Sequence, residues 1–287
     1  MTRAASPEIV FATCLVQPDF QPGDRLVAEA LERLGARVRP TPWNGGFDAF
    51  SRADMVVVRS TWDYWDHAAT FVRWLVALDG AACVVNSPSL MRWNLDKRYL
   101  LALAAGGAPI TPTLAVENCA GAIMAALDAL GLSRAVVKPV IGATASGLSI
   151  IERSDSTGIE RAAAALTGPG LVQAVIPEIR AGETSFVFIE GTFSHAVLKI
   201  PAEGDIRCQV EHGGRTVNCL PSAAAVDQAR EILEMLPERP LYARVDAIVL
   251  DDRLIVMEVE VIEPELFVVH APAAADRFAS ALMRRLD

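Results

Sequence analysis

The chain has 287 residues, of which 52% are hydrophobic and 21% are charged, and its formal net charge at pH 7 is −9. This length can bury an extensive core, and the apolar content excludes a disordered chain. No apolar run approaches the ~20 residues of a membrane-spanning helix, and the acidic balance argues against nucleic acid as a partner. Because the sequence shows neither an export signal nor a Cys-x-x-Cys pair, we expect a cytoplasmic protein with reduced thiols.

The first third of the chain alternates apolar runs with amphipathic segments. Apolar runs predict strands at residues 9–16, 36–41, 54–59 and 83–86. A helix capped by Asp24 and ended by Gly35 is predicted after the first strand, and another is marked by Phe71, Leu75 and Leu78. Strands alternating with helices predict an α/β unit with a parallel sheet covered on both faces.

The remainder divides into two further units. A helix is predicted over Leu95–Ala105, and a small strand–helix unit extends from Thr113 to Ala174. Beyond it, one hairpin turns at Glu190-Gly191 and another at residues 251–253, with helices predicted near 223–236 and 273–286. We therefore expect three units around one cleft: residues 1–93, 94–175 and 176–287.

Three acidic residues stand out on the second hairpin. Asp246 lies in an otherwise apolar strand, and Glu258 and Glu260 lie on the returning strand. Residues two apart in a strand point to the same face, and Asp246 can face them from its partner strand. Converging carboxylates suit Mg²⁺, which typically also binds substrate phosphates. The alternative is a solvated outer face of the hairpin, which the alternation fits equally well.

Isolated lysines stand at or near the ends of apolar segments. Lys97, Lys138 and Lys199 are the residues concerned. Such a lysine can simply extend its ammonium group to water. Lys138, however, leads into residues 140–147, a loop of small residues whose backbone N–H groups could approach phosphate oxygens. A flexible hairpin tip has the same composition, and the standard phosphate-binding motifs G-x-x-x-x-G-K-[ST] and G-x-G-x-x-G are absent.

Taken together in order and spacing, these features resemble the ATP-grasp superfamily from about Asn94 to Pro264. The resemblance implies an ATP-grasp fold, with an α+β lid and core behind an N-terminal parallel-sheet domain. It implies ATP as a cofactor. Two lysines and a lid loop would contact the phosphates, a hinge strand would contact the adenine, and an acidic residue would bind the ribose. Carried over position by position, the cofactor-binding residues are Lys97, Lys138, Gly142, Ser146, Gly147, Gln173, Ala174, Ile176 and Glu183.

The same resemblance implies two Mg²⁺ ions, held by Asp246, Glu258 and Glu260. Glu260 stands where the superfamily usually has Asn, and its extra negative charge affects the second metal site. Arg207 matches the arginine that steadies the transferred phosphate, and Lys199 is expected to hold a phosphate or the nucleotide. These two residues are the catalytic candidates.

A narrower resemblance rests on residues 58–64, 94–97 and 258–267. They look like a subgroup of small stand-alone ATP-grasp proteins that includes a D-cycloserine-forming ligase, which cyclises O-ureido-serine. The first of these segments follows a predicted parallel strand, at the edge where open α/β sheets bind ligands. A capped helix start is the alternative for that segment. The candidate substrate residues are Arg59, Ser60, Thr61, Trp62, Asp63, Tyr64 and Glu263.

The resemblance implies an ATP-dependent ligase that acts on a small amino-acid-like molecule. A substrate carboxylate would attack the γ-phosphate of ATP, and an amine of the same or another molecule would then displace phosphate from the acyl phosphate. Two alternatives remain open, a ligase that extends a peptide or protein and a nucleotide-binding module without catalysis. Many members of the superfamily are dimers, so a homodimer is one possible state.

Overall fold

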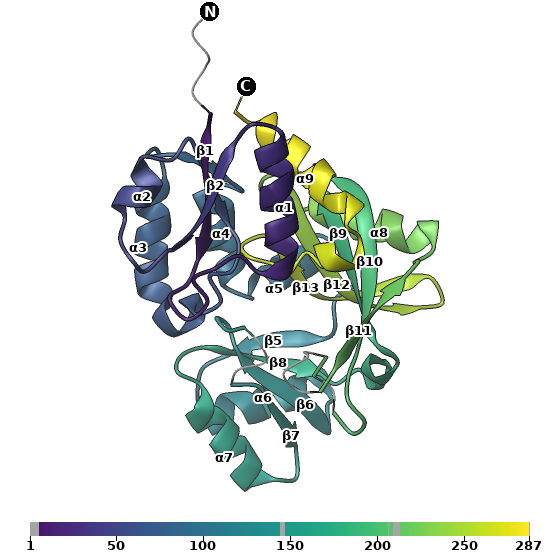
Figure 1. The fold of residues 1–287 in the computed structure, drawn as a ribbon. Helices are drawn as coiled ribbons and strands as arrows, with labels where there is room; N and C mark the ends of the chain where they lie inside the picture. Colours follow the sequence, from purple (N-terminus) through teal and green to yellow (C-terminus); the bar gives the residue numbers. More distant parts are fainter. Residues whose placement is uncertain (1–5, 144–146, 206, 209–212, 287) are drawn as a thin grey trace, which may run out of the picture.

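The computed structural model describes residues 6–143, 147–205, 207–208 and 213–286. Three sheets occupy successive parts of the chain, within residues 8–85, 113–174 and 183–260. Figure 1 shows the second of them below the other two, with the start of β1 and the end of α9 at the opposite end of the molecule. The division at residues 93 and 175 stays a prediction about folding units.

The first sheet is parallel and has helices on both faces. Its order is β2-β1-β3-β4, formed by Arg37–Pro42, Glu8–Thr13, Met55–Val58 and Cys83–Val85. Ile9 and Phe11 pack toward helices α1 (Pro22–Arg33) and α9 (Ala273–Met283). Val10 and Ala12 pack toward α2 (Asp48–Ser51), α3 (Ala68–Leu78) and α4 (Pro88–Leu95). Because both faces are covered, β1 is continuously apolar, and the predicted parallel sheet is confirmed.

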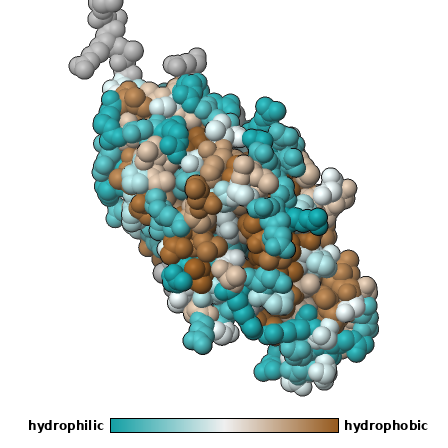
Figure 2. All heavy atoms as spheres, turned by 90° about the vertical axis from the view of Figure 1, so that its right-hand side faces the viewer, coloured by the Kyte–Doolittle hydropathy of each residue, from teal (hydrophilic) through white to brown (hydrophobic). Residues whose placement is uncertain are grey.

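The second sheet is antiparallel and forms a small lobe. Its strands stand in the order β5-β8-β6-β7, and helices α6 and α7 bury its apolar face. The elements are β5 (Thr113–Val116), α6 (Ala120–Leu130), β6 (Arg134–Pro139), β7 (Ser149–Glu152), α7 (Ser156–Ala165) and β8 (Gly170–Ala174). In Figure 2 this lobe extends from the lower end of the larger body, and apolar residues gather near the middle of that face.

The third sheet is antiparallel, in the order β11-β10-β9-β12-β13. Both predicted hairpins are confirmed: Glu190 and Gly191 have φ of 51° and 72°, and Asp251 and Asp252 have φ of 46° and 62°. Two successive left-handed residues are what a two-residue hairpin turn requires. The elements are η2 (Pro177–Ala181), β9 (Glu183–Ile189), β10 (Thr192–Ile200), β11 (Arg215–Cys219), α8 (Ala223–Glu234), β12 (Tyr242–Leu250), β13 (Arg253–Glu260) and η4 (Val268–His270).

The structure corrects two local predictions. The single helix expected over Leu95–Ala105 is divided, because Asp96 is extended and α5 (Tyr99–Ala105) begins after it. At this break the Lys97 N–H donates to the Val140 carbonyl of the lobe, at 2.7 Å, instead of continuing a helix. Asp24 does not cap α1, which begins at Pro22; its carboxylate instead pairs with Arg59 inside the protein.

Among the described residues, no helix is both long and apolar enough to cross a membrane.

Candidate active site

A cavity of about 470 Å³ lies where the three sheets meet. Its wall includes Trp62 from the segment after β3, Lys138 from the lobe and Asp246 from the third sheet. The chain has three lysines, Lys97, Lys138 and Lys199, and all of them line this cavity. Residues that are far apart in the sequence, and that the sequence pattern singled out separately, therefore share one space.

The polar face of the β12–β13 hairpin forms part of the cavity wall. In the register of the two strands Asp246 stands opposite Glu258, and Arg244 stands opposite Glu260. The alternate residues of β12, such as Val245, point into the apolar core on the other side. Asp246 is only 3% exposed, so this face is not the solvated outer face that the sequence left open.

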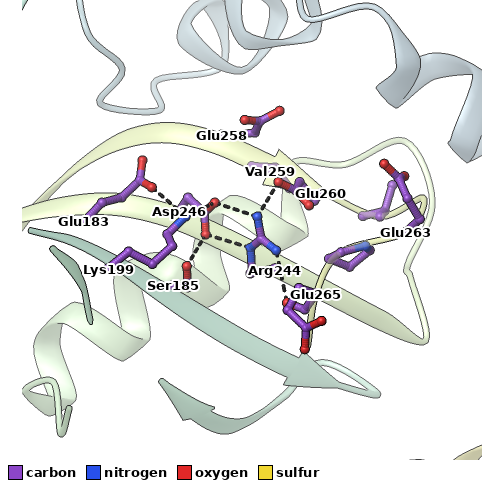
Figure 3. A network of polar contacts seen from close by, with 12 residues as sticks. Glu183, Ser185, Lys199, Arg244, Asp246, Glu258, Val259, Glu260, Glu263 and Glu265 are labelled. Carbon is purple, nitrogen blue, oxygen red and sulfur yellow. Dashed lines mark hydrogen bonds and ion pairs between the residues drawn. The ribbon is translucent and has the colours of Figure 1, made fainter. Parts of the chain in front are cut away.

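Arg244 and Lys199 hold Asp246 from two sides (Figure 3). The Arg244 guanidinium donates to both carboxylate oxygens of Asp246, at 2.9 Å each, and also pairs with Glu260. The Lys199 ammonium lies 2.8 Å from Asp246 and 2.6 Å from Glu183. The Ser185 hydroxyl donates to Asp246 at 2.6 Å. Every one of these groups belongs to β9, β10, β12 or β13, so the sheet fixes their arrangement.

The three carboxyl groups of the wall differ in how their surroundings shift the pKa. Burial favours the neutral form of Asp246, but Arg244 and Lys199 outweigh it and hold the pKa well below its ordinary value. Burial acts on Glu258 in the same direction, and the ion pair with Lys97, helped by Lys138, lowers its pKa. Burial raises the pKa of Glu260 to about 7, despite Arg244, and Glu258 and Asp246 add to the rise.

Two further groups have pKa values close to neutrality. Burial, together with the nearby charge of Lys97, lowers the pKa of Lys138 to about 8. Burial and the neighbouring carboxylate of Glu260 raise the pKa of Glu263 to about 8. Perturbed groups of opposite sign in one cavity are typical of a functional site.

The donor set of the wall fits a hard divalent cation such as Mg²⁺. Asp246, Glu258 and Glu260 present carboxylate oxygens on one sheet face, and such ligands suit that ion. In the described structure basic side chains neutralise them instead, and no group of three or more His, Cys, Asp or Glu side chains there is assembled as a metal site. The assignment of these three residues as metal ligands therefore stays a prediction.

Most of the expected nucleotide residues line the cavity. They are Lys97, Lys138, Gly142, Gln173, Ala174, Ile176 and Glu183. Gly147 does not line it; its φ is +70°, and a Cβ at this position would lie 3.2 Å from Pro139 Cδ. Ser146 lies outside the described residues. Arg207 also lines the cavity, with its guanidinium held 2.7 Å from Asp205.

Only part of the expected substrate segment reaches the cavity. Trp62, Tyr64 and Glu263 line it. Arg59 does not, since its side chain is buried against Asp24 at 2.7 Å and against the Pro264 carbonyl at 3.0 Å. The expectation of substrate contact is therefore corrected for this residue.

The same correction applies to three neighbours of Arg59. Ser60 and Thr61 are fully buried and do not line the cavity. The Asp63 carboxylate accepts hydrogen bonds from Trp43 and Asn44, at 2.6 and 2.8 Å. A short helix, η1 (Tyr64–His67), begins here as the alternative prediction expected, but the Asp63 side chain does not cap it.

Two residues of the site were not predicted from the sequence. Arg244 lies two positions before Asp246, and the alternation that predicted the direction of Asp246 predicts the same direction for Arg244. Asn94 lines the cavity, and its amide donates to the Val259 carbonyl at 2.8 Å and accepts from the Val261 N–H at 3.1 Å. Its role depends on a contact 165 residues away in the sequence, which no local pattern carries.

A lysine-lined cavity under a small antiparallel lobe, with acids on the sheet below it, is the arrangement of an ATP-grasp ligase. Residues 106–268 match the family model of the prokaryotic glutathione synthetase ATP-grasp domain, and the chain belongs to this family of ATP-dependent ligases, which use ATP and Mg²⁺. Residues 9–86 match the model of the N-terminal domain of D-cycloserine synthetase DcsG.

Among known proteins, the chain is similar to the cycloserine biosynthesis protein DcsG of Streptomyces lavendulae. The two are 30% identical over 277 residues, which is 90% of this chain and 92% of that protein. The crystal structure of D-cycloserine synthetase DcsG matches with a TM-score of 0.84 at 25% identity, covering 98% of this chain and all of that one.

More distant relatives are similar to part of this chain or have only the fold in common with it. Glutathione synthetase of Gloeobacter violaceus is 30% identical over 159 residues, 54% of this chain and 46% of that protein. The ATP-grasp ligase PsnB matches with a TM-score of 0.66 at 18% identity, which shows a common fold.

Proposed function

We propose that this ligase activates the carboxylate of a small amino-acid-like molecule and closes that molecule into a cyclic amide, forming D-cycloserine from O-ureido-serine. One observation carries the proposal: the likeness to DcsG continues through residues 9–86, the unit that supplies Trp62 and Tyr64 to the cavity. The ATP-grasp part alone would fit many ligases. In this proposal the first unit builds the substrate end of the cavity, since open α/β sheets bind ligands at the carboxyl ends of their strands.

In this proposal the nucleotide lies between the lobe and the third sheet. Gln173, Ala174 and Ile176 form the wall that would hold the adenine ring. Glu183 would take the ribose, and Lys97 and Lys138 would bind the phosphates. Positive side chains that line a cavity are well suited to that charge.

Two Mg²⁺ ions at Asp246, Glu258 and Glu260 would neutralise charge on the phosphates of ATP and reduce their repulsion of an attacking carboxylate. Glu258 pairs with Lys97 and Asp246 with Lys199. Metal binding would therefore release these two ammonium groups for the phosphate oxygens.

The chemistry balances in two steps. A carboxylate oxygen of the substrate forms a bond to the γ-phosphorus, the bond from that phosphorus to the β–γ bridging oxygen breaks, and ADP leaves. The oxygen-linked nitrogen of the ureido group then attacks the acyl phosphate, the C–O bond to phosphate breaks, and the nitrogen loses its proton. Water finally removes the carbamoyl group left on the ring nitrogen, as carbamate. Arg207 and Arg244 would stabilise the negative charge that moves with the phosphoryl group.

A phosphate-release assay tests the proposal. Purified protein with ATP and Mg²⁺ is given each enantiomer of O-ureido-serine, a panel of free amino acids, or short peptides. We expect ADP and phosphate with O-ureido-serine and a product of the mass of cycloserine. Release only with a peptide, or ATP binding without any product, would support the peptide-ligase or non-catalytic alternatives instead.

A further inference from the structure

Among the described residues, one buried carboxyl group at the substrate end of the cavity forms no ion pair. Glu263 lies on the loop after β13 and is 8% exposed. It lines the cavity, yet it takes part in none of the ion pairs found among the described residues, and Figure 3 shows it apart from the Arg244 network. Burial disfavours the charged form of this carboxyl group, and a positive group from a bound molecule would offset that cost.

The walls beside Glu263 also suit a positive group. Tyr64 and Trp62 line the same part of the cavity, and the Tyr64 hydroxyl faces the Glu263 carboxylate. The Tyr64 ring is stacked on Phe71, with centroids 4.8 Å apart, so its position is fixed. Aromatic rings attract ammonium groups through the negative faces of their π systems.

Side chains of the first unit and of β12 hold the loop of Glu263 in place. The Trp62 indole donates to the Glu263 carbonyl at 3.2 Å, and Arg59 donates to the Pro264 carbonyl at 3.0 Å. The Tyr242 hydroxyl donates to the Ile262 carbonyl at 2.8 Å. Three side chains thus fix three successive carbonyl groups, which restricts the direction of the Glu263 side chain.

We propose that Glu263, with Tyr64 beside it, binds the α-ammonium group of the substrate and so selects amino acids over other carboxylic acids. The proposal rests on the proposed function for the presence of an activated carboxylate in the same cavity. Held by its ammonium group at Glu263, the substrate would direct its carboxylate toward Lys97, whose charge acts on both Glu263 and Glu258.

The test compares two substrates in two proteins. The substrates are O-ureido-serine and 3-(ureidooxy)propanoic acid, which lacks only the α-amino group, and the proteins are the wild type and Glu263→Gln. We expect the variant to raise KM for O-ureido-serine by roughly 10- to 100-fold, the effect of one charged hydrogen bond. The molecule without the amino group should be equally poor for both proteins.

Controls separate this result from a general disturbance. Glu152→Gln, on the exposed end of β7, should leave KM unchanged. The Kd of a non-hydrolysable ATP analogue, measured by calorimetry, should be the same for wild type and Glu263→Gln. If Glu263→Gln weakens both substrates by the same factor, or lowers kcat alone, Glu263 does not bind the ammonium group.

Failure of the proposed function gives a different result. If the wild type releases no phosphate with O-ureido-serine, the substrate assignment is wrong. The ammonium site is then tested by phosphate release from paired amino acids and their deaminated counterparts. A wild-type preference for amino acids that Glu263→Gln loses would support the site, and equal use of both series by the wild type would overturn it.

Discussion

In the proposed function, Lys138 is a buried charge that binds phosphate. Its ammonium group lies in the cavity beside Lys97, and the unfavourable surroundings lower its pKa to about 8. A phosphate group would remove both penalties, because it supplies the missing negative charge. This placement supports the proposed role in ligand binding over a role in stability.

Lys138→Met should accordingly lower kcat by about 100-fold, the scale of removing one group that stabilises developing charge. Thermal stability should be unchanged or higher, because the variant no longer buries a charge. Phosphate release and thermal denaturation measure the two effects. Arg134→Met, at the exposed end of the same strand, is the matched control and should alter neither. Unchanged turnover in Lys138→Met would contradict the assignment.

Arg59 is expected to act through stability. Its guanidinium forms a buried ion pair with Asp24, and removing one partner leaves an unpaired buried charge. Arg59→Met should therefore lower the free energy of unfolding by about 3–5 kcal/mol, as seen in urea denaturation. The double variant Asp24→Leu, Arg59→Met should recover most of this loss. A rise in substrate KM with full stability would instead restore Arg59 as a substrate ligand.

At the level of elements, hydrophobic periodicity and turn residues in the sequence predict the strands and hairpins. The β1 run is apolar because two cores cover it, and both hairpins carry residues that accept left-handed conformations. The break between α4 and α5 was not predictable, because it depends on the hydrogen bond from Lys97 to Val140, which follows strand β6 much further along the chain. Arg59 was likewise misassigned, because Asp24, its partner, is 35 residues away.

A glycine before β9 provides a test of how an element positions the site. Gly182 has φ of +119°, and a Cβ there would lie 2.7 Å from Leu198 Cδ1 and 3.1 Å from the Lys199 carbonyl. Gly182→Ala should cost about 1–3 kcal/mol of stability. It should also weaken nucleotide binding, because Glu183 and Lys199 adjoin it. Urea denaturation and calorimetry measure these effects.

The control for this substitution is Gly121→Ala. Gly121 lies within α6 with open space around it, so alanine should raise stability by up to about 1 kcal/mol. If both variants behave alike, the conformation of Gly182 is not important for the site.

For the whole molecule, Glu263 predicts a pH dependence of stability. Its pKa is raised to about 8 in the folded protein, from an ordinary value near 4.5. The folded state therefore binds this proton more tightly, and the resulting stabilisation is full below pH ~4.5 and is lost as pH rises through 8, by at most about 1.4 kcal/mol per pH unit. Glu263→Gln should lose less stability than wild type between pH 6 and 9 in urea denaturation without ligand. Parallel curves would contradict the raised pKa.

The distribution of lysines has a practical consequence at the same scale. All three side-chain amines of the protein line one cavity, while the other basic side chains are arginines or histidines. An amine-directed acylating reagent, such as a succinimidyl ester, would then modify the N-terminal α-amino group. Within the folded chain, the only side chains that it could acylate are the lysines of this cavity. Lys138, with its pKa of about 8, should react first, and bound nucleotide should shield it. Labelling followed by peptide mass spectrometry would thus report whether nucleotide occupies the cavity. A common conjugation reagent would in this way probe the active site.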